Sequence, residues 1–316
     1  MRGSAARRGP ARYTAVIAAG LLALLAALSA LCAAPPRAAA VFHADDDWRH
    51  VQTVLEALER RPGSTPIVYL LGGSSAREAL TNEPDWRAQI AAFGGGSVRA
   101  YNFGSASQTY AEGITVVERS PEVPTIVLIG VNVGRYTPPY PGAAAALLPP
   151  SAAAAAPGGR TYYDSHRFHI GWQLSDAAKG ALVSKWLHER YPVFKARYSH
   201  HAALLHDLVA ACQARGFRPV IVELPLNLPI VGHAWDAPRH KYQAACRAVA
   251  KKYGIGYVDF IADIGLTSGD FVDLAHLVEP GRAKYQRRLS HLVVNRLRQY
   301  HLDSITPRKE SVPDNG

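Results

Sequence analysis

Two stretches of the chain, residues 66–133 and 200–302, alternate short β-branched or aliphatic runs with segments of helical periodicity. This alternation is typical of a parallel α/β sheet, in which a helix connects each strand to the next. Five runs are nearly continuously apolar, as strands covered on both faces should be. They span residues 67–71, 98–103, 125–129, 219–224 and 256–260. The sequence therefore predicts an α/β fold with an open, doubly wound, five-stranded parallel sheet flanked by helices.

Signals for helix ends fall between these runs. Ser199 is the expected N-cap of a helix running to Arg215, and Gly216 and Gly254 stand where helix C-caps belong. Pro280 opens a last helix, whose apolar stripe is formed by Tyr285, Leu289, Val293 and Leu297. Helices are therefore expected to fill the gaps between the strands.

Residues 134–199 do not fit the alternation, and we interpret them as an insertion after the third strand. The first half holds prolines and two alanine-rich tracts, 143–146 and 152–156, which bury too little surface to be ordered. We expect a loop there. The second half should be helical and could cover the upper edge of the sheet; its large aromatic residues are Trp172, Trp186, Tyr191 and Phe194. The main domain then spans residues 41–302, and residues 303–316 form a carboxyl-terminal tail.

The first 40 residues favour a membrane anchor. Arginines precede an uncharged run of 22 residues, 13–34, which as a helix at about 1.5 Å per residue is long enough to cross a bilayer. The alternative is a cleavable signal peptide, because Ala38-Ala39-Ala40 supplies a small-x-small site before Val41. In both cases the bulk of the chain lies outside the cytoplasm, which in a bacterium means the periplasm, with the anchor in the inner membrane.

The charge distribution argues against a nucleic-acid-binding protein, and the two cysteines beyond residue 40 are expected in the core. Lysine plus arginine exceed aspartate plus glutamate by 35 to 25, but residues 1–40 contain five arginines and no acid. No dense basic block with interleaved aromatic residues occurs, so we expect no nucleic-acid partner. Cys212 and Cys246 lie on the apolar stripes of predicted helices and are interpreted as buried thiols. A disulfide between them stays open as an alternative, because successive crossover helices can lie side by side.

Polar residues follow the predicted strands, where ligands bind in doubly wound folds. Ser74 follows the first strand, Ser107 the second and Asn132 the third, while Asp273 and His276 come after the fifth. A hydroxyl, amide donors, an imidazole and a carboxylate are the parts of nucleophilic acyl transfer. A serine nucleophile needs a base, the base needs an orienting acid, and the developing oxyanion needs donors.

Taken in order, these blocks resemble the SGNH or GDSL hydrolases. Gly72-Gly73-Ser74 is similar to the family's first block, with glycine in place of the usual aspartate, and Ser107 stands where the second block has a glycine. Gly130-Val131-Asn132 and the spacing of Asp273 and His276 match the third and last blocks. The resemblance implies a flavodoxin-like SGNH hydrolase fold, a catalytic triad of Ser74, His276 and Asp273, and an oxyanion hole that includes Ser107 and Asn132.

Two adjacent serines satisfy the loose Gly-x-Ser pattern. The family's nucleophile follows the last apolar residue of the strand by three positions, which after Leu71 selects Ser74. Ser75 begins a segment leading into a helix and is interpreted as a capping residue.

The expected function is hydrolysis of acyl esters, such as O-acetyl esters of a cell-envelope glycan, by an extracytoplasmic member of this family. An O-acyltransferase using the same triad is one alternative, and a non-catalytic glycan-binding or scaffold protein is another. No cofactor and no metal are expected. One cluster of histidine and aspartate residues resembles a set of metal ligands, but we interpret it as a solvated face or helix cap. The cluster consists of His43, Asp45, Asp46, Asp47 and His50.

Overall fold

The computed structural model describes residues 46–138 and 173–303. Their centre is a five-stranded sheet with strand order β2-β1-β3-β4-β5, in which every neighbouring pair is parallel. The strands are β1 (Ile67–Leu71), β2 (Arg99–Asn102), β3 (Thr125–Val131), β4 (Arg218–Glu223) and β5 (Gly256–Val258). This order is that of a flavodoxin-like doubly wound sheet, so the predicted fold class is confirmed.

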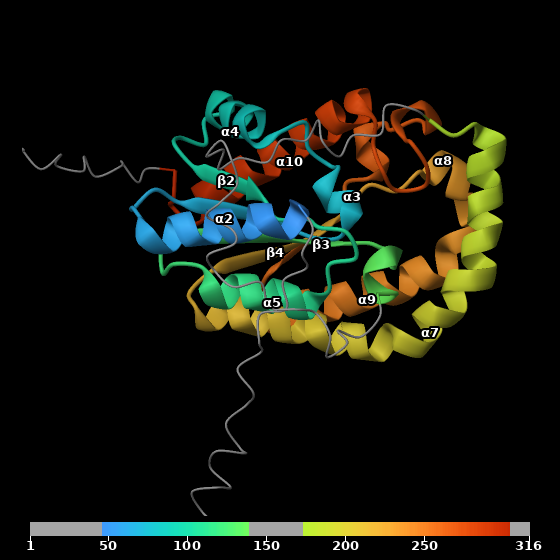
Figure 1. Ribbon diagram of the computed structural model, residues 1–316, viewed down its shortest axis with the longest axis horizontal. Coiled ribbons are helices and arrows are strands. Elements are labelled where there is room, and N and C mark those ends of the chain that lie inside the picture. The colour runs from blue at the N-terminus through green and yellow to red at the C-terminus, as the bar shows by residue number, and fades with distance from the viewer. Residues whose placement is uncertain (1–45, 139–172, 304–316) are drawn as a thin grey trace, which may run out of the picture. The chain divides into compact units, whose positions relative to one another are not determined.

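Helices cover both faces of the sheet. The longer ones are α2 (Asp46–Arg60), α4 (Glu83–Ala92), α5 (Tyr110–Arg119), α7 (Asp176–Ala214), α9 (Asp236–Tyr253) and α10 (Glu279–Gln299). The short ones are α3 (Ser74–Arg77), α8 (Leu228–Val231), η1 (Val133–Tyr136), η3 (Gly232–Trp235), η4 (Ala262–Ile264) and η5 (Ser268–Asp270). Helices α4 and α10 pack together on one side of the sheet, and α5, α7 and α9 on the other (Figure 1).

Apolar strand residues explain why the layers stay together. On the α4 and α10 side, Val68 and Leu128 are fully buried against Trp86 and Leu289. All five residues of β1 and all seven of β3 are buried. A strand that is apolar along its whole length loses the most water-exposed area when helices cover both of its faces. The continuous apolar runs seen in the sequence therefore become the central strands.

The ends of some strands differ from those predicted from the sequence. Strand β3 extends two residues past the predicted end to Val131, and β5 ends at Val258 rather than at residue 260. Gly254 adopts a left-handed conformation at the C-cap of α9, as predicted, and Pro280 lies in the first turn of α10. These glycine and proline signals are reliable because they reflect backbone geometry that few other residues adopt.

The predicted helix start at Ser199 is wrong. Helix α7 runs unbroken from Asp176 to Ala214, and its N-cap is Ser175, whose hydroxyl accepts a hydrogen bond from the backbone N–H of Ala178 at 3.3 Å. The aromatic half of the predicted insertion and the helix that covers the sheet are thus one element. Helix α7 bends along its length (Figure 1), and Pro192 in its interior removes a backbone donor there.

Other predictions fall on residues that the structure does not describe. These include the apolar run 13–34, the alanine-rich tracts, Trp172 and the tail beyond residue 303. Over residues 46–138 and 173–303, no helix is long and apolar enough to span a membrane.

Cys212 and Cys246 are buried free thiols, so the disulfide alternative is not realised. Burial raises the pKa of the Cys212 thiol to about 12, because a thiolate is poorly solvated in an apolar interior. The Cys246 sulfur lies 3.7 Å from the Tyr136 hydroxyl. Both thiols are therefore unreactive members of the core.

We expect Gly104→Ala to lower the free energy of unfolding by about 1–3 kcal/mol. A methyl group at this position would lie 2.4 Å from the backbone nitrogen of Arg77, and backbone cannot move aside as a side chain can. Gly180→Ala in α7 is the control, since its methyl group would meet nothing within 4 Å. It should raise stability by about 0.5–1 kcal/mol. Equal urea midpoints for Gly104→Ala and the wild type would contradict the close approach.

Candidate active site

The carboxyl edge of the sheet brings the predicted site residues together. Ser74 begins α3 three residues after β1 ends at Leu71. His276 lies in the segment between η5 and α10, 202 residues further along the chain. The His276 Nε2 atom is 2.8 Å from the Ser74 Oγ atom, a normal hydrogen-bond distance.

Asp273 completes this chain of hydrogen bonds. Its Oδ2 atom lies 2.8 Å from His276 Nδ1, so the imidazole is held between the carboxylate and the serine hydroxyl. The other carboxylate oxygen, Oδ1, accepts the backbone N–H groups of Ala275 and His276, both at 2.9 Å. The Asp273 side chain is thus fixed by its own loop, and the geometry selects the tautomer in which Nε2 accepts from Ser74.

A residue that the sequence did not point to supports this loop. Asn227 is fully buried, and its side-chain nitrogen donates to the backbone oxygen of Asp273 at 3.0 Å. The backbone N–H of Asn227 donates to the oxygen of Leu274 at 2.9 Å. Asn227 therefore anchors the Asp273 segment to the end of β4, a contact between residues too distant in the chain to be recognised from a motif.

Asp273 and His276 shift each other's pKa. Burial opposes ionisation of Asp273, but hydrogen bonds from His276 and from backbone N–H groups lower the pKa of its carboxyl below the ordinary value. Burial by itself lowers the pKa of the His276 imidazole, yet the hydrogen bond and negative charge of Asp273 outweigh it, so the pKa is raised. The carboxylate thus favours an imidazole that accepts a proton.

Asn132 borders the same space from the end of β3. It is 6% exposed, and its side-chain nitrogen donates to the hydroxyl of Ser75 at 3.0 Å. The interpretation of Ser75 as a capping residue is wrong, because α3 has Gly73 at its N-cap and no side-chain cap. Ser75 instead faces inward, is 7% exposed and orients the Asn132 amide. The second hydrogen of that amide is left to meet a ligand.

Ser107 has an unusual backbone for its residue type. Its φ of 56° lies in the left-handed region, where glycine is far more common than serine. This conformation gives a physical reason for the glycine that the resembled family has at this position. The Ser107 side chain is exposed, whereas Gln108 beside it is fully buried.

Buried polar groups hold the loops around Ser74 and Ser107. Asn102 at the end of β2 donates to the backbone oxygens of Ala76 and Arg77, at 3.0 and 3.1 Å. Asp47 on α2 accepts from Arg77 at 3.0 Å and from the backbone N–H of Ala106 at 2.9 Å. Asp47 thus binds elements of the scaffold rather than standing on a solvated face, which corrects that interpretation for this residue.

These side chains surround a cavity of about 510 Å³. Its catalytic side is formed by the loops after β1, β2 and β3 and by the segment 273–276, and its opposite wall by one face of α7 with Leu226 and Trp235. The five predicted site residues all line it: Ser74, Ser107, Asn132, Asp273 and His276. The α7 wall carries Leu182, Lys185, Trp186, Glu189 and Arg190.

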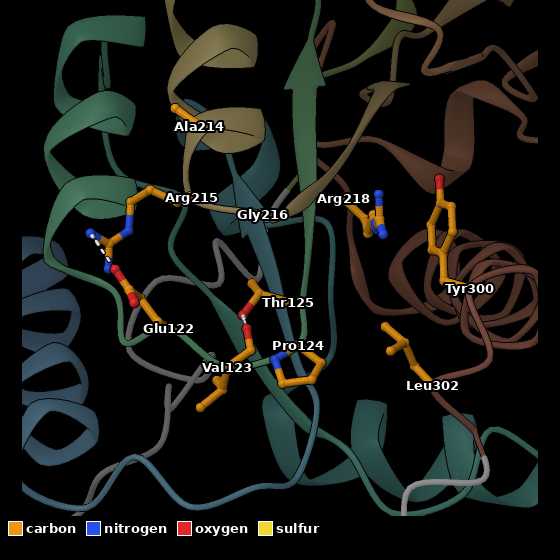
Figure 2. Close-up of a pocket in the computed structure, with 10 residues that line it drawn as sticks. All are labelled: Glu122, Val123, Pro124, Thr125, Ala214, Arg215, Gly216, Arg218, Tyr300 and Leu302. Carbon is orange, nitrogen blue, oxygen red and sulfur yellow. Dashed lines mark hydrogen bonds and ion pairs between the residues drawn. The ribbon is translucent and has the colours of Figure 1, made fainter.

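A second cavity, of about 430 Å³, lies at the other end of β3 and β4, beside Thr125 and Arg218 (Figure 2). Arg215 and Glu122 form an ion pair of 3.8 Å on its rim. No serine, cysteine or histidine lines this cavity in the described part of the chain. Its chemistry gives no nucleophile–base pair, so the site at the carboxyl edge is the candidate.

Among residues 46–138 and 173–303, no group of three or more histidine, cysteine, aspartate or glutamate side chains is arranged to hold a metal ion. His50, from the acidic segment near the amino terminus, instead lies with its Nε2 atom 3.0 Å from a carboxylate oxygen of Glu83. His43 and Asp45 lie outside the described residues.

No protein-family model and no curated protein matches the chain. Matches among solved structures include a Bacteroides fragilis protein described as an acylhydrolase, at 12% identity and a TM-score of 0.44, covering 80% of this chain and 100% of that one. A lipase/acylhydrolase from Enterococcus faecalis is 11% identical, with a TM-score of 0.40 and coverage of 78% and 100%. A GDSL-like lipase from Bacteroides thetaiotaomicron is 11% identical, with a TM-score of 0.42 and the same coverage.

We expect Asp273→Asn to lower the pKa of His276. The substitution removes the negative charge and the acceptor that raise this pKa, and leaves the burial that lowers it. NMR titration of the imidazole should give a value above about 6.5 in the wild type and a lower one in the variant. Ser74→Ala is the control, because it keeps the carboxylate and should retain a raised pKa. Superimposable titration curves for wild type and Asp273→Asn would show that Asp273 does not set this pKa.

Proposed function

We propose that this site hydrolyses acyl esters, with Ser74 as nucleophile, His276 as general base and Asp273 as the acid that orients the imidazole. One observation carries the proposal. A continuous hydrogen-bond chain runs from the Ser74 hydroxyl through both ring nitrogens of His276 to Asp273, with 2.8 Å at each link. A serine hydroxyl becomes a useful nucleophile only when an adjacent base takes its proton, and this geometry supplies that base.

The first half of the reaction acylates the enzyme. The Ser74 oxygen bonds to the acyl carbon while its proton passes to His276 Nε2, and the carbonyl π electrons move onto the oxygen. When the tetrahedral intermediate collapses, the bond to the alcohol breaks and His276 gives its proton to the leaving alkoxide. Asp273 stabilises the imidazolium formed in between.

Water completes the second half. His276 removes a proton from a water molecule, whose oxygen attacks the acyl carbon, and the acid is released as Ser74 regains its proton. His276 acts as a base only when neutral. The rate therefore increases with pH through the raised pKa of His276, at a higher pH than an unperturbed histidine would give.

The oxyanion of each intermediate needs donors fixed in advance. Asn132 supplies a side-chain N–H held by Ser75, and the backbone N–H groups of Ser74 and Ser107 lie on the loops that line the same cavity. Replacing the usual glycine by Ser107 keeps this backbone donor, because the left-handed conformation is retained.

The cavity wall supports a sugar ester as substrate. The Trp186 and Trp235 rings lie with centroids 4.4 Å apart and planes tilted by 39°, and both line the same cavity as Ser74. Trp235 is 3% exposed, so it fixes the partly exposed Trp186 ring, an apolar face suited to a sugar ring. Lys185, Glu189 and Arg190 on the same face of α7 offer charged hydrogen-bonding groups to sugar hydroxyls.

A second candidate function is O-acyl transfer. A sugar hydroxyl resting on Trp186 would replace water in the second half of the reaction, with the same triad. The indole pair in the wall of the cavity that holds Ser74 is the observation that favours an acceptor of this kind. Product analysis separates the two functions, because only transfer gives an acylated acceptor.

We also propose where in the cell this reaction takes place. The arginine-flanked apolar run 13–34 supports an inner-membrane protein with its catalytic domain in the periplasm, or a secreted protein after cleavage near Val41. Cell-envelope glycans carrying acyl groups are the substrates that such a location would expose to the site.

We expect Ser74→Ala to lower kcat on an activated acyl ester by at least about 10³-fold and to abolish labelling by a fluorophosphonate. Asn132→Ala should lower kcat by about 10²–10³-fold, because it removes one oxyanion donor. Ser75→Ala, the matched control, keeps the nucleophile and should still be labelled, with a rate between those of the wild type and Asn132→Ala. Peptide mapping of the label to Ser75, or turnover unchanged in folded Ser74→Ala, would overturn the assignment.

We expect Trp186→Ala to raise KM for an acetylated oligosaccharide by about 10-fold, as loss of an aromatic contact of about 1–1.5 kcal/mol implies. The KM for p-nitrophenyl acetate should change less than twofold, because that ester has no sugar to place on the indole. His188→Ala, on α7 but outside the cavity lining, is the control. Equal effects on both substrates would argue against a sugar-binding role for Trp186.

A further inference from the structure

Arg135 is a buried cation beside the proposed site. It lies in η1, three residues after Asn132, and is 2% exposed. One guanidinium nitrogen, Nη1, donates to the backbone oxygen of Gln108. The guanidinium carbon lies 4.5 Å from the ring centroid of Tyr110, so the charge rests on an aromatic face.

Among the residues that the structure describes, Arg135 forms no ion pair within 4.0 Å, and the negative charge of Glu112 acts on it from further away. The Nε and Nη2 atoms of Arg135 are covered from solvent and lack hydrogen-bond acceptors. Burial lowers the pKa of this guanidinium, although Tyr110 and Glu112 oppose that effect. A buried charge without a close ion pair adds little to the stability of a fold, so stability alone does not explain an arginine at this position.

Arg135 is bonded to two of the loops that carry proposed oxyanion donors and lies near the third. Its Nη1 holds Gln108, the neighbour of Ser107, and its own backbone N–H donates to the Asn132 side-chain oxygen at 3.3 Å. A methyl group added at Gly73, next to Ser74, would lie 3.8 Å from the Cδ atom of Arg135. Arg135 is thus bonded to the loops after β2 and β3 and lies close to the loop after β1.

We propose that Arg135 is a positioning residue for the oxyanion hole: it fixes the Ser107 and Asn132 donors and places a permanent positive charge behind them. The proposal rests on the esterase function proposed above. Because the guanidinium is fixed before the reaction begins, it stabilises the developing oxyanion without reorganisation. The charge acts more strongly in a buried setting than it would in water.

The burial of the guanidinium distinguishes this role from direct substrate binding. Arg135 lines the cavity, but its Nε and Nη2 atoms are covered, so a substrate cannot contact these two atoms as the loops stand. Arg135 therefore acts through the loops and through its field, and its removal should change kcat more than KM. Removing an unpaired buried charge should also leave the fold as stable as before or more stable.

The experiment compares Arg135→Met and Arg135→Lys in the full chain, using an activated acyl ester. We expect Arg135→Met to lower kcat by about 10–100-fold, part of what loss of a direct donor causes. The KM should stay within twofold, the acid limb of the pH–rate profile should not move, and Tm should be unchanged or higher. Arg135→Lys, which keeps the charge but not the planar fork, should recover part of the lost kcat.

Arg215→Met is the matched control. Arg215 also donates to a backbone oxygen, that of Ser120, and lies over an aromatic ring, Phe217, but at the cavity of Figure 2 at the opposite end of β3 and β4. Its loss should lower Tm and leave kcat unchanged.

Three outcomes would overturn the proposal for Arg135. They are wild-type kcat in Arg135→Met, a fall in kcat matched by a fall in Tm with no recovery in Arg135→Lys, and a rise in KM at constant kcat. Failure of the esterase function itself would appear separately, as turnover by the wild type that is unaffected by Ser74→Ala.

Discussion

The parallel register of β1 and β3 is the constraint on which the site depends. Leu71 pairs with Ile129 in this register, and Ser74 and Asn132 each follow three residues later. The two side chains are thereby brought to the same edge, where Asn132 bonds to Ser75. Gly130 permits the close approach, since a methyl group there would lie 2.8 Å from the backbone oxygen of Leu71. A shift of register by one residue would separate the nucleophile from its proposed oxyanion donor.

Around this register, the molecule places buried polar groups where a hydrolase would need rigidity. Asn102, Asn227 and Asp47 each bridge two segments through hydrogen bonds to backbone atoms. Such groups stabilise a fold only when their bonds are satisfied, because an unsatisfied buried polar atom costs about 1–3 kcal/mol. Among the described residues, several buried polar atoms lack a hydrogen-bond partner, and the Nε and Nη2 atoms of Arg135 are two of them. Proteins most often leave buried polar atoms without partners at functional sites. The position of Arg135 next to the proposed donors Ser107 and Asn132 agrees with this tendency.

Sequence-based predictions were mostly correct where the feature depends on residues close together in the chain. Some were wrong where it depends on a contact with a distant residue. The five strands were found because apolar runs indicate burial, which is complete in β1 and β3 and partial in the edge strands β2 and β5. Gly254 and Pro280 were placed because each marks a particular backbone geometry. Ser199 and Ser75 were assigned wrongly as caps. A serine near a helix start is an equally good cap by sequence whether its hydroxyl meets a backbone N–H or, like Ser75, a distant side chain.

The sequence by itself determined the α/β class with five parallel strands and a set of polar residues at strand ends that includes Ser74 and His276. Only the tertiary structure decided that the His276 imidazole lies 2.8 Å from both Ser74 and Asp273. It also decided that α7 forms part of the cavity wall and that Arg135 is buried with bonds to the loops of Gln108 and Asn132. Hydrophobic periodicity is a property of neighbouring residues, whereas these contacts join residues far apart in the chain and depend on how the layers pack.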